Sequence, residues 1–132
     1  MTRPLTRAEI AQLVFERDDR QCAHCGISRH LSIQHRRGRG AGGSKRLEGP
    51  ENKTLLCWVH NSRIEGDYVA AEEARQLGWK VDRFDPREAW EVPIWHKTLG
   101  WRQLLPNGQY LLIGGPDDVR PLPEDTGDWP CA

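Results

Sequence analysis

The sequence lacks any apolar run long enough to span a membrane, and its first residues, MTRPLTRAEI, contain no signal-peptide core. Both absences predict a cytoplasmic protein without a membrane partner. Cysteines in that compartment stay reduced and bind metals more often than each other. The sequence also contains no internal repeat, and its 132 residues predict one domain, or one domain with an appendage.

Net charge is absent as well, but the charges are unevenly distributed. Residues 1–66 hold 12 Lys and Arg against 7 Asp and Glu, whereas residues 67–132 hold 7 against 12. The stretch 29–46 has six basic residues and no acidic one. Such a stretch is typical of a segment that contacts phosphate, and equally of a loop that its charge keeps soluble. Charge alone does not separate these two interpretations.

Short local patterns predict the first helix and two strands. Thr6 is followed three residues later by Glu9, a capping box that starts a helix, which we expect to end near Asp19. The alternating segment 30–35, HLSIQH, predicts a half-buried strand, and 53–58, KTLLCW, predicts a second one. The 17 residues between these segments hold five glycines and a proline, which predicts a loop.

The second half of the sequence begins with helical patterns and then changes character. WVHNSRIE at 58–65 predicts a helix, and Asp67 caps a further helix that ends near Leu77. Farther along, short strand-like runs around the pair Asn107-Gly108 predict a β-hairpin. Four of the six tryptophans lie between residues 79 and 101, and we expect them to cover the core.

Three cysteines and a histidine have the spacing of a zinc site. Cys22 and Cys25 form a C-x2-C pair, and after 31 further residues Cys57 and His60 form a C-x2-H pair. Structural zinc takes four such ligands, which arrive as two close pairs, and Gly26 permits the tight turn of the first pair. We therefore expect a closed structural Zn²⁺ site. One alternative is a set of buried thiols and a surface histidine without metal. Another is that His60 does not bind the zinc and serves catalysis instead.

Four segments carry a resemblance to a known family. CAHCG, IQHRRGRGAGGS, PENKTLLC and HNSRIEGD follow one another along residues 17–67. In this order they resemble the HNH endonucleases, in particular the small HNH proteins of actinobacterial phages. The resemblance implies an α+β fold with a ββα-metal core, in which two short strands and a helix hold a divalent ion and a zinc knuckle braces them.

The resemblance also implies roles for individual residues. His35 matches the general base, and Asn52 matches the asparagine that pins the long loop and orients that base. Asn61 matches a ligand of a catalytic Mg²⁺ or Mn²⁺. Gln34 stands where the family commonly has an aspartate or a histidine as the other ligand. Because Gln34 and Asn61 are both neutral, they are weak ligands for a hard cation, and we expect the DNA phosphate to supply much of the negative charge.

Basic residues of the loop complete the expected site. Arginine forks fit phosphate oxygens, so we expect the basic side chains that follow His35 to bind DNA. They are Arg36, Arg37, Arg39, Lys45 and Arg46.

The resulting prediction is a divalent-metal-dependent endonuclease that hydrolyses phosphodiester bonds and nicks or cuts duplex DNA. The resemblance further implies phage genome processing or packaging in the host cytoplasm, with packaging proteins such as terminase as partners. Two other functions stay open. One is a zinc-stabilised DNA-binding module without catalysis, and the other is a zinc-scaffolded protein-interaction domain.

The shared motif sets the expected division of the chain. We expect a zinc-braced nuclease domain over residues 1–78, which includes the N-terminal helix. A Trp-rich β-hairpin extension over 79–118 lies outside the motif. The acidic, proline-rich residues 119–132 are predicted to be disordered.

Overall fold

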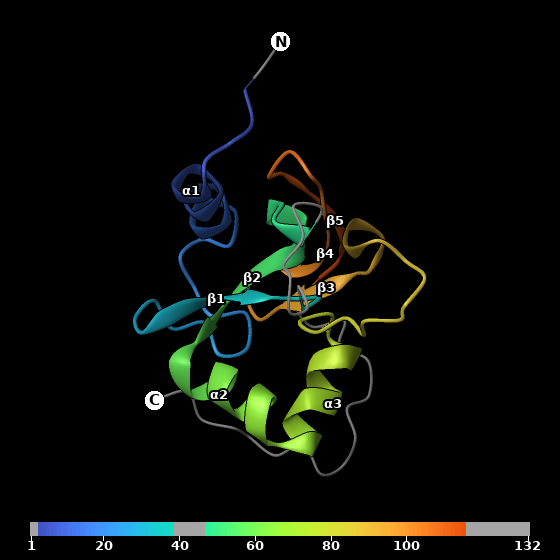
Figure 1. Cartoon of the computed structure of the whole chain (residues 1–132). Coiled ribbons are helices and arrows are strands. Elements are labelled where there is room, and N and C mark those ends of the chain that lie inside the picture. Colours follow the sequence, from blue (N-terminus) through green and yellow to red (C-terminus); the bar gives the residue numbers. More distant parts are fainter. Residues whose placement is uncertain (1–2, 39–46, 116–132) are drawn as a thin grey trace.

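The computed structural model describes residues 3–38 and 47–115 of the chain. In this part, three α-helices and two small antiparallel sheets form a mixed α+β fold, as expected (Figure 1). None of the described helices combines the length and the apolar character needed to cross a membrane. The predicted tail 119–132 lies outside the described residues.

The first helix, α1 (Arg7–Arg17), begins at the predicted capping box. The hydroxyl of Thr6 accepts the backbone N–H of Glu9, and the Glu9 carboxylate accepts the backbone N–H of Thr6. Two donors at the helix start are thereby satisfied within four residues of chain, which is why the sequence revealed this boundary. Asp18 caps the other end.

The first sheet and the helix after it form a continuous unit. Strands β1 (Leu31–His35) and β2 (Lys53–Cys57) pair antiparallel, with Leu31 opposite Cys57 and His35 opposite Lys53. The short 3-10 helix η2 (Pro50–Asn52) leads into β2. Helix α2 (Trp58–Gly66) follows β2 without a linker and packs against both strands.

A third helix and a second sheet complete the described chain. Helix α3 (Tyr68–Gln76) starts at Asp67, whose carboxylate accepts the backbone N–H groups of Val69 and Ala70, so the predicted cap is confirmed. After the 3-10 helix η3 (Ala89–Glu91), strands β3 (Ile94–His96), β4 (Gly100–Leu104) and β5 (Tyr110–Gly114) form a sheet in the order β3-β4-β5.

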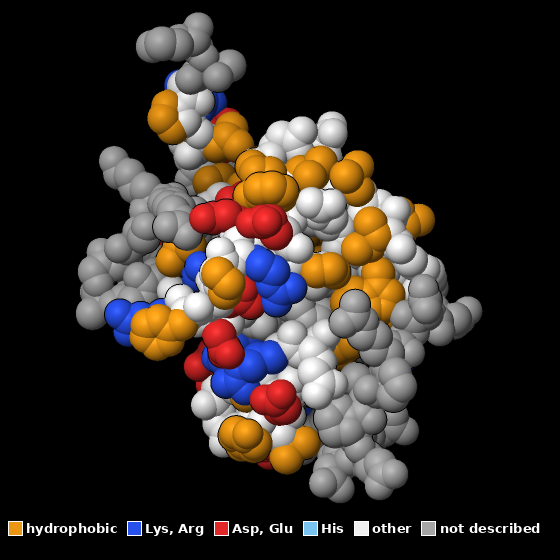
Figure 2. Space-filling view, turned by 90° about the vertical axis from the view of Figure 1, so that its right-hand side faces the viewer, with side chains coloured by type: hydrophobic (Ala, Val, Ile, Leu, Met, Phe, Trp, Pro, Cys, Tyr) orange, Lys and Arg blue, Asp and Glu red, His pale blue; other side chains and the backbone are white. Residues whose placement is uncertain are grey.

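The predicted hairpin joins β4 to β5. Gly108 adopts a φ of +88°, a conformation that L side chains rarely adopt, and its N–H donates to Leu105. The loop of residues 80–88 projects on the right-hand side of Figure 1. Figure 2 views that side, where acidic and basic side chains lie beside one another.

One hydrophobic cluster unites residues on both sides of the predicted boundary at residue 78. Trp79 is fully buried in it and Trp101 is 7% exposed, as expected, but Trp90 is 40% exposed, so the prediction that all four tryptophans of this region cover the core is wrong for Trp90. The extension therefore packs on the same core as the first sheet, and the division into two segments stays a prediction. The buried members of the cluster are Cys22, Ala23, Leu56, Cys57, Ile64, Ala74, Leu77, Trp79, Ile94, Trp101 and Leu104.

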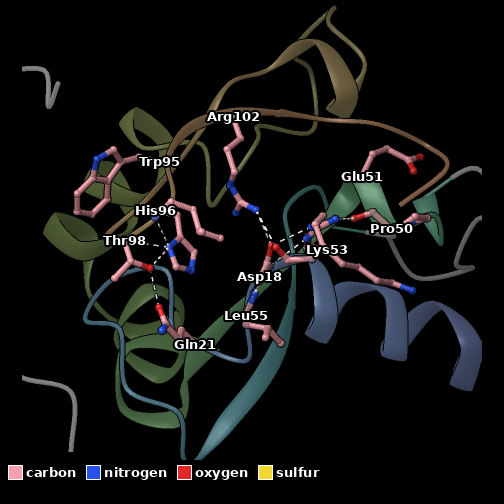
Figure 3. A network of polar contacts seen from close by, with 12 residues as sticks. Asp18, Gln21, Pro50, Glu51, Lys53, Leu55, Trp95, His96, Thr98 and Arg102 are labelled. Atoms are coloured by element: carbon pink, nitrogen blue, oxygen red, sulfur yellow. Dashed lines mark hydrogen bonds and ion pairs between the residues drawn. The ribbon is translucent and has the colours of Figure 1, made fainter. Parts of the chain in front are cut away.

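A buried ion cluster also ties the N-terminal helix to the second sheet (Figure 3). The Asp18 carboxylate lies 2.8 Å from Nε of Arg17 and 2.9 Å from Nη1 of Arg102, and it accepts the backbone N–H of Leu55. Burial alone would raise the pKa of Asp18, but the two guanidinium groups lower it to about 2. The end of α1, β2 and β4 thus converge on one ionised carboxylate.

Candidate active site and metal centre

Three cysteines come together beside the end of β2. The ligand sulfurs of Cys22, Cys25 and Cys57 all lie within 4.8 Å of one another, which is close enough to hold a metal ion such as Zn²⁺. The turn that carries the first two closes through a hydrogen bond from Gly26 N–H to Cys22 O, and Gly26 adopts a φ of +80°, as predicted. Ala23 N–H donates to Leu55 O, which places this turn against β2.

Backbone groups point at the sulfurs. The N–H of Cys57 donates to Sγ of Cys22 at 3.2 Å, and the N–H of His60 donates to Sγ of Cys57 at 3.4 Å. Such donors partly offset burial, which raises the pKa of the Cys22 thiol and disfavours the thiolate that binds metals. Cys22 and Cys57 take part in no disulfide, whereas Cys25 is disulfide-bonded, so a metal bound by all three sulfurs requires Cys25 to be reduced.

His60 is fully buried next to this cluster but is not a member of it. Its ring stacks on the ring of His24 at 3.8 Å, and neither ring nitrogen has a hydrogen-bond partner among the described residues. Burial, followed by the charges of His24 and Arg63, lowers the pKa of His60 to about 3. A neutral imidazole is the form that binds zinc, so the fit is chemically sound, and the role of His60 as fourth ligand stays a prediction.

A cleft of about 450 Å³ lies along the outer edge of β1. In the described residues β1 pairs only with β2, so its other edge is open, and Gln34 and His35 both reach the cleft although successive strand residues point to opposite faces. We call this hollow the β1 cleft. It is lined by Ile33, Gln34, His35, Arg36, Gly38, Glu65, Lys80, Val81, Asp82 and Arg83.

A carboxylate lies next to the ring of His35. The distance from His35 Nε2 to Glu48 Oε1 is 3.5 Å, and the other oxygen of Glu48 lies 3.4 Å from Nζ of Lys53. The side chains of His35 and Glu48 are each 27% exposed. A carboxylate beside one ring nitrogen orients an imidazole and stabilises it once it has taken up a proton.

Asn52 is fully buried and fastens the chain directly after His35. Its Oδ1 accepts the N–H of Arg37 at 2.8 Å, and its Nδ2 donates to the carbonyl oxygens of Arg37 and Leu47, both at 3.0 Å. These bonds join the two sides of the 39–46 segment to the start of β2. This is the contact that the resemblance implies for Asn52, and its effect on catalysis stays a prediction.

The two amides expected to bind a catalytic ion lie on the same side of β1. Asn61 Nδ2 donates to Oγ of Ser32 at 2.9 Å, and Ser32 and Gln34 share a face of the strand, about 7 Å apart. Asn61 Oδ1 is buried and has no hydrogen-bond partner among the described residues. The Gln34 side chain is also buried, and no hydrogen bond joins it to another described residue. Gln34 lines the β1 cleft whereas Asn61 is not among its lining residues, so the structure does not bring both amides to the cleft. Both amides nevertheless have hydrogen-bonding capacity that the described chain does not use.

The structure contradicts the prediction that Arg36 and Arg37 bind DNA. Arg36 is 1% exposed, and its guanidinium donates to the carbonyl oxygens of Gly78, Glu51, Ala89 and Val92 at 2.7–3.0 Å. Burial lowers its pKa to about 9. Arg37 is 8% exposed and donates to Asp85 O at 2.9 Å.

These arginines are committed to backbone carbonyls, so they hold the extension against the first sheet and cannot grip a phosphate. A count of charges in the sequence could not show this burial. Arg39, Lys45 and Arg46 lie outside the described residues.

Other residues of the β1 cleft were missed by the sequence reasoning. Glu65 lies one helical turn after Asn61 in α2, and that i, i+4 spacing was a signal that could have found it. Lys80 and Arg83 come from beyond the shared motif, and no local pattern in the sequence indicated that their segment forms a wall of the cleft.

Comparisons of the chain with protein-family models, with curated proteins and with solved structures found no match. The chemistry and placement of the side chains described above are therefore the basis for any functional proposal.

Proposed function

We propose that the chain is a divalent-metal-dependent DNA endonuclease of the HNH type, with β1, β2 and α2 as its ββα-metal core. The observation that supports this most is the β1 cleft, because it brings together His35, Gln34 and Glu65. A base, a neutral amide and a carboxylate at one hollow are the groups that metal-assisted phosphodiester hydrolysis uses.

In this proposal His35 is the general base. A neutral imidazole accepts a proton from a water molecule that attacks the phosphorus. Glu48 Oε1 lies 3.5 Å from Nε2, an ion-pair distance rather than a hydrogen bond, and would stabilise the ring once Nδ1 has taken the proton. Asn52 prevents the end of β1 from shifting, because its side chain forms hydrogen bonds with Arg37 and Leu47, which lie on the two sides of the 39–46 segment.

A divalent ion would be held by oxygen donors from β1 and α2. Gln34 and Asn61 offer amide oxygens, and the unpartnered, buried Oδ1 of Asn61 fits such a role. Glu65 adds the carboxylate that Gln34 does not supply, which gives the set the negative charge that Mg²⁺ and Mn²⁺ favour. When bound, the ion stabilises charge on the scissile phosphate and on the leaving 3′ oxygen.

Nicking of supercoiled plasmid tests the proposal. The reduced, zinc-loaded protein should convert supercoiled plasmid to open circles with Mg²⁺ or Mn²⁺, and His35→Ala should lose at least about 100-fold of that activity, the usual contribution of a general base. The control His30→Ala removes an exposed histidine just before β1 and should keep the wild-type nicking activity. Glu65→Gln should require more Mg²⁺ for the same rate. If the plasmid stays intact with the wild-type protein in both Mg²⁺ and Mn²⁺, the proposal is refuted.

A second function is favoured by one observation. The two amides of Gln34 and Asn61 are uncharged, and a zinc-stabilised module that binds DNA without cleaving it would also tolerate them. That module would bind DNA with a steep salt dependence and leave plasmid intact. For the nuclease, genome processing or packaging with terminase as a partner stays a prediction.

A further inference from the structure

We propose that residues 80–84 form a contact for single-stranded DNA, in which Lys80 and Arg83 line the β1 cleft and the adjacent Phe84 stacks on an unpaired base. This inference rests on the proposed function only in taking DNA as the partner. It assigns the recognition of the strand to the segment after Trp79, which lies outside the motif that carries the resemblance.

Phe84 is the first observation. Its side chain is 88% exposed, more than any other large hydrophobic side chain in the described residues. Nothing in the described core uses this ring, although an exposed phenylalanine is costly in water. The guanidinium carbon of Arg83 lies 5.6 Å from the centre of the ring. An aromatic face beside an arginine is the pair on which nucleic-acid bases stack without regard to their sequence.

The charges around Phe84 are the second observation. Asp82 is paired with Arg75 at 2.8 Å, and Asp85 is paired with Arg87 at 2.9 Å. Figure 2 shows this face, where acidic and basic side chains lie side by side. Lys80 and Arg83 also line the cleft, and neither forms an ion pair with another described residue. Asp82 and the neighbouring Asp85 are thus neutralised within the protein, while Lys80 and Arg83 remain for a phosphate backbone.

The third observation is how the segment is attached. The N–H of Val81 donates to the carbonyl oxygen of Arg36 at 2.8 Å, and Arg37 donates to the carbonyl oxygen of Asp85 at 2.9 Å. These two arginines directly follow His35 in the chain. The buried arginines that cannot reach DNA themselves therefore fix Lys80, Arg83 and Phe84 relative to His35. A strand whose base stacks on Phe84 would pass its backbone by Lys80 and Arg83 toward the cleft.

Binding of labelled oligonucleotides tests this contact. A short oligonucleotide with one 2-aminopurine would be titrated, as a single strand and as a duplex, with zinc-loaded protein and without Mg²⁺ or Mn²⁺. Wild type should bind the single strand and quench the 2-aminopurine by stacking. Phe84→Ala should weaken single-strand binding about tenfold and abolish the quenching, since one stacked base contributes on the order of 1–3 kcal/mol. Phe84→Trp should keep both properties.

Tyr68→Ala is the matched control, because Tyr68 is an aromatic side chain that is 79% exposed at the start of α3. It should leave affinity and quenching unchanged. The double variant Lys80→Gln, Arg83→Gln should weaken binding and reduce the slope of log K against log salt by about 1.4, or about 0.7 per phosphate contact. Because Phe84 is almost fully exposed, its substitution should not affect folding, which circular dichroism checks.

The outcomes separate this contact from the proposed nuclease. Unchanged binding by Phe84→Ala overturns the contact, whether or not the wild type nicks plasmid. An equal loss for single strand and duplex overturns the unpaired-base assignment and indicates a wedge in the duplex. If the wild type fails to nick plasmid but Phe84→Ala selectively loses single-strand binding, the contact is supported and the nuclease is refuted.

Discussion

Glu73 provides a direct test of how burial acts on charge in this fold. Its side chain lies on the buried face of α3, the residue is 3% exposed, and Oε2 has no hydrogen-bond partner among the described residues. Burial raises its pKa from 4.5 to about 7, because a carboxylate without partners is poorly solvated there. Glu73→Gln keeps the shape of the side chain and removes its ionisation.

The magnitude follows from the two pKa values. The folded protein binds the proton more tightly than the unfolded chain, so the stability from this group is fully present below pH 4.5 and is lost as the pH rises through about 7. At about 1.4 kcal/mol per pKa unit, the loss is about 3 kcal/mol at pH 8 and less than about 1 kcal/mol at pH 5. The stability gained by Glu73→Gln should therefore be about 2.5 kcal/mol larger at pH 8 than at pH 5.

Urea unfolding at both pH values, followed by tryptophan fluorescence, measures this difference. Metal binding also depends on pH, but it does so equally in wild type and variant and cancels in the comparison. Glu72→Gln is the control, since that carboxylate pairs with Arg75 at 3.1 Å and its side chain is 42% exposed, so its effect should stay within about 0.5 kcal/mol. A gain from Glu73→Gln that is equal at both pH values would refute the reasoning.

Three further predictions concern the buried charges and the thiols. Arg36→Lys should lower the free energy of unfolding by about 3 kcal/mol, because an ammonium cannot reach four separate carbonyls, and an undiminished urea midpoint would contradict this. Asp18→Asn should cost about 3–5 kcal/mol, since Arg17 and Arg102 lose their buried partner. In wild type the ionised Asp18 contributes to the free energy of unfolding above about pH 4, and this contribution is lost as the pH falls through about 2. Acid unfolding should therefore show this loss of stability only below about pH 4. The reduced protein should bind one equivalent of Co²⁺ with a thiolate charge-transfer band that Cys57→Ser weakens, and a chelator that leaves the melting temperature unchanged would argue against structural zinc.

Patterns confined to a few residues were predicted correctly from the sequence. The capping box at Thr6, the cap at Asp67 and the turn at Gly108 all appear in the structure at the expected positions. Each depends on hydrogen bonds or backbone angles within about four residues, so the chain specifies it wherever the segment lies. The C-x2-C turn is of the same kind, which explains why two of the three close sulfurs were predictable as a pair.

The sequence by itself thus determined the order of helices and strands and the chemical types available for a site. The tertiary structure decided which of these side chains meet water and which meet each other. Arg36 and Arg83 have the same charge in the sequence, but the first donates to four carbonyls in the interior and the second lines a cleft beside Phe84. Solvation and partners for a charge come from segments more than forty residues away, such as Gly78 for Arg36, and no local pattern encodes that contact.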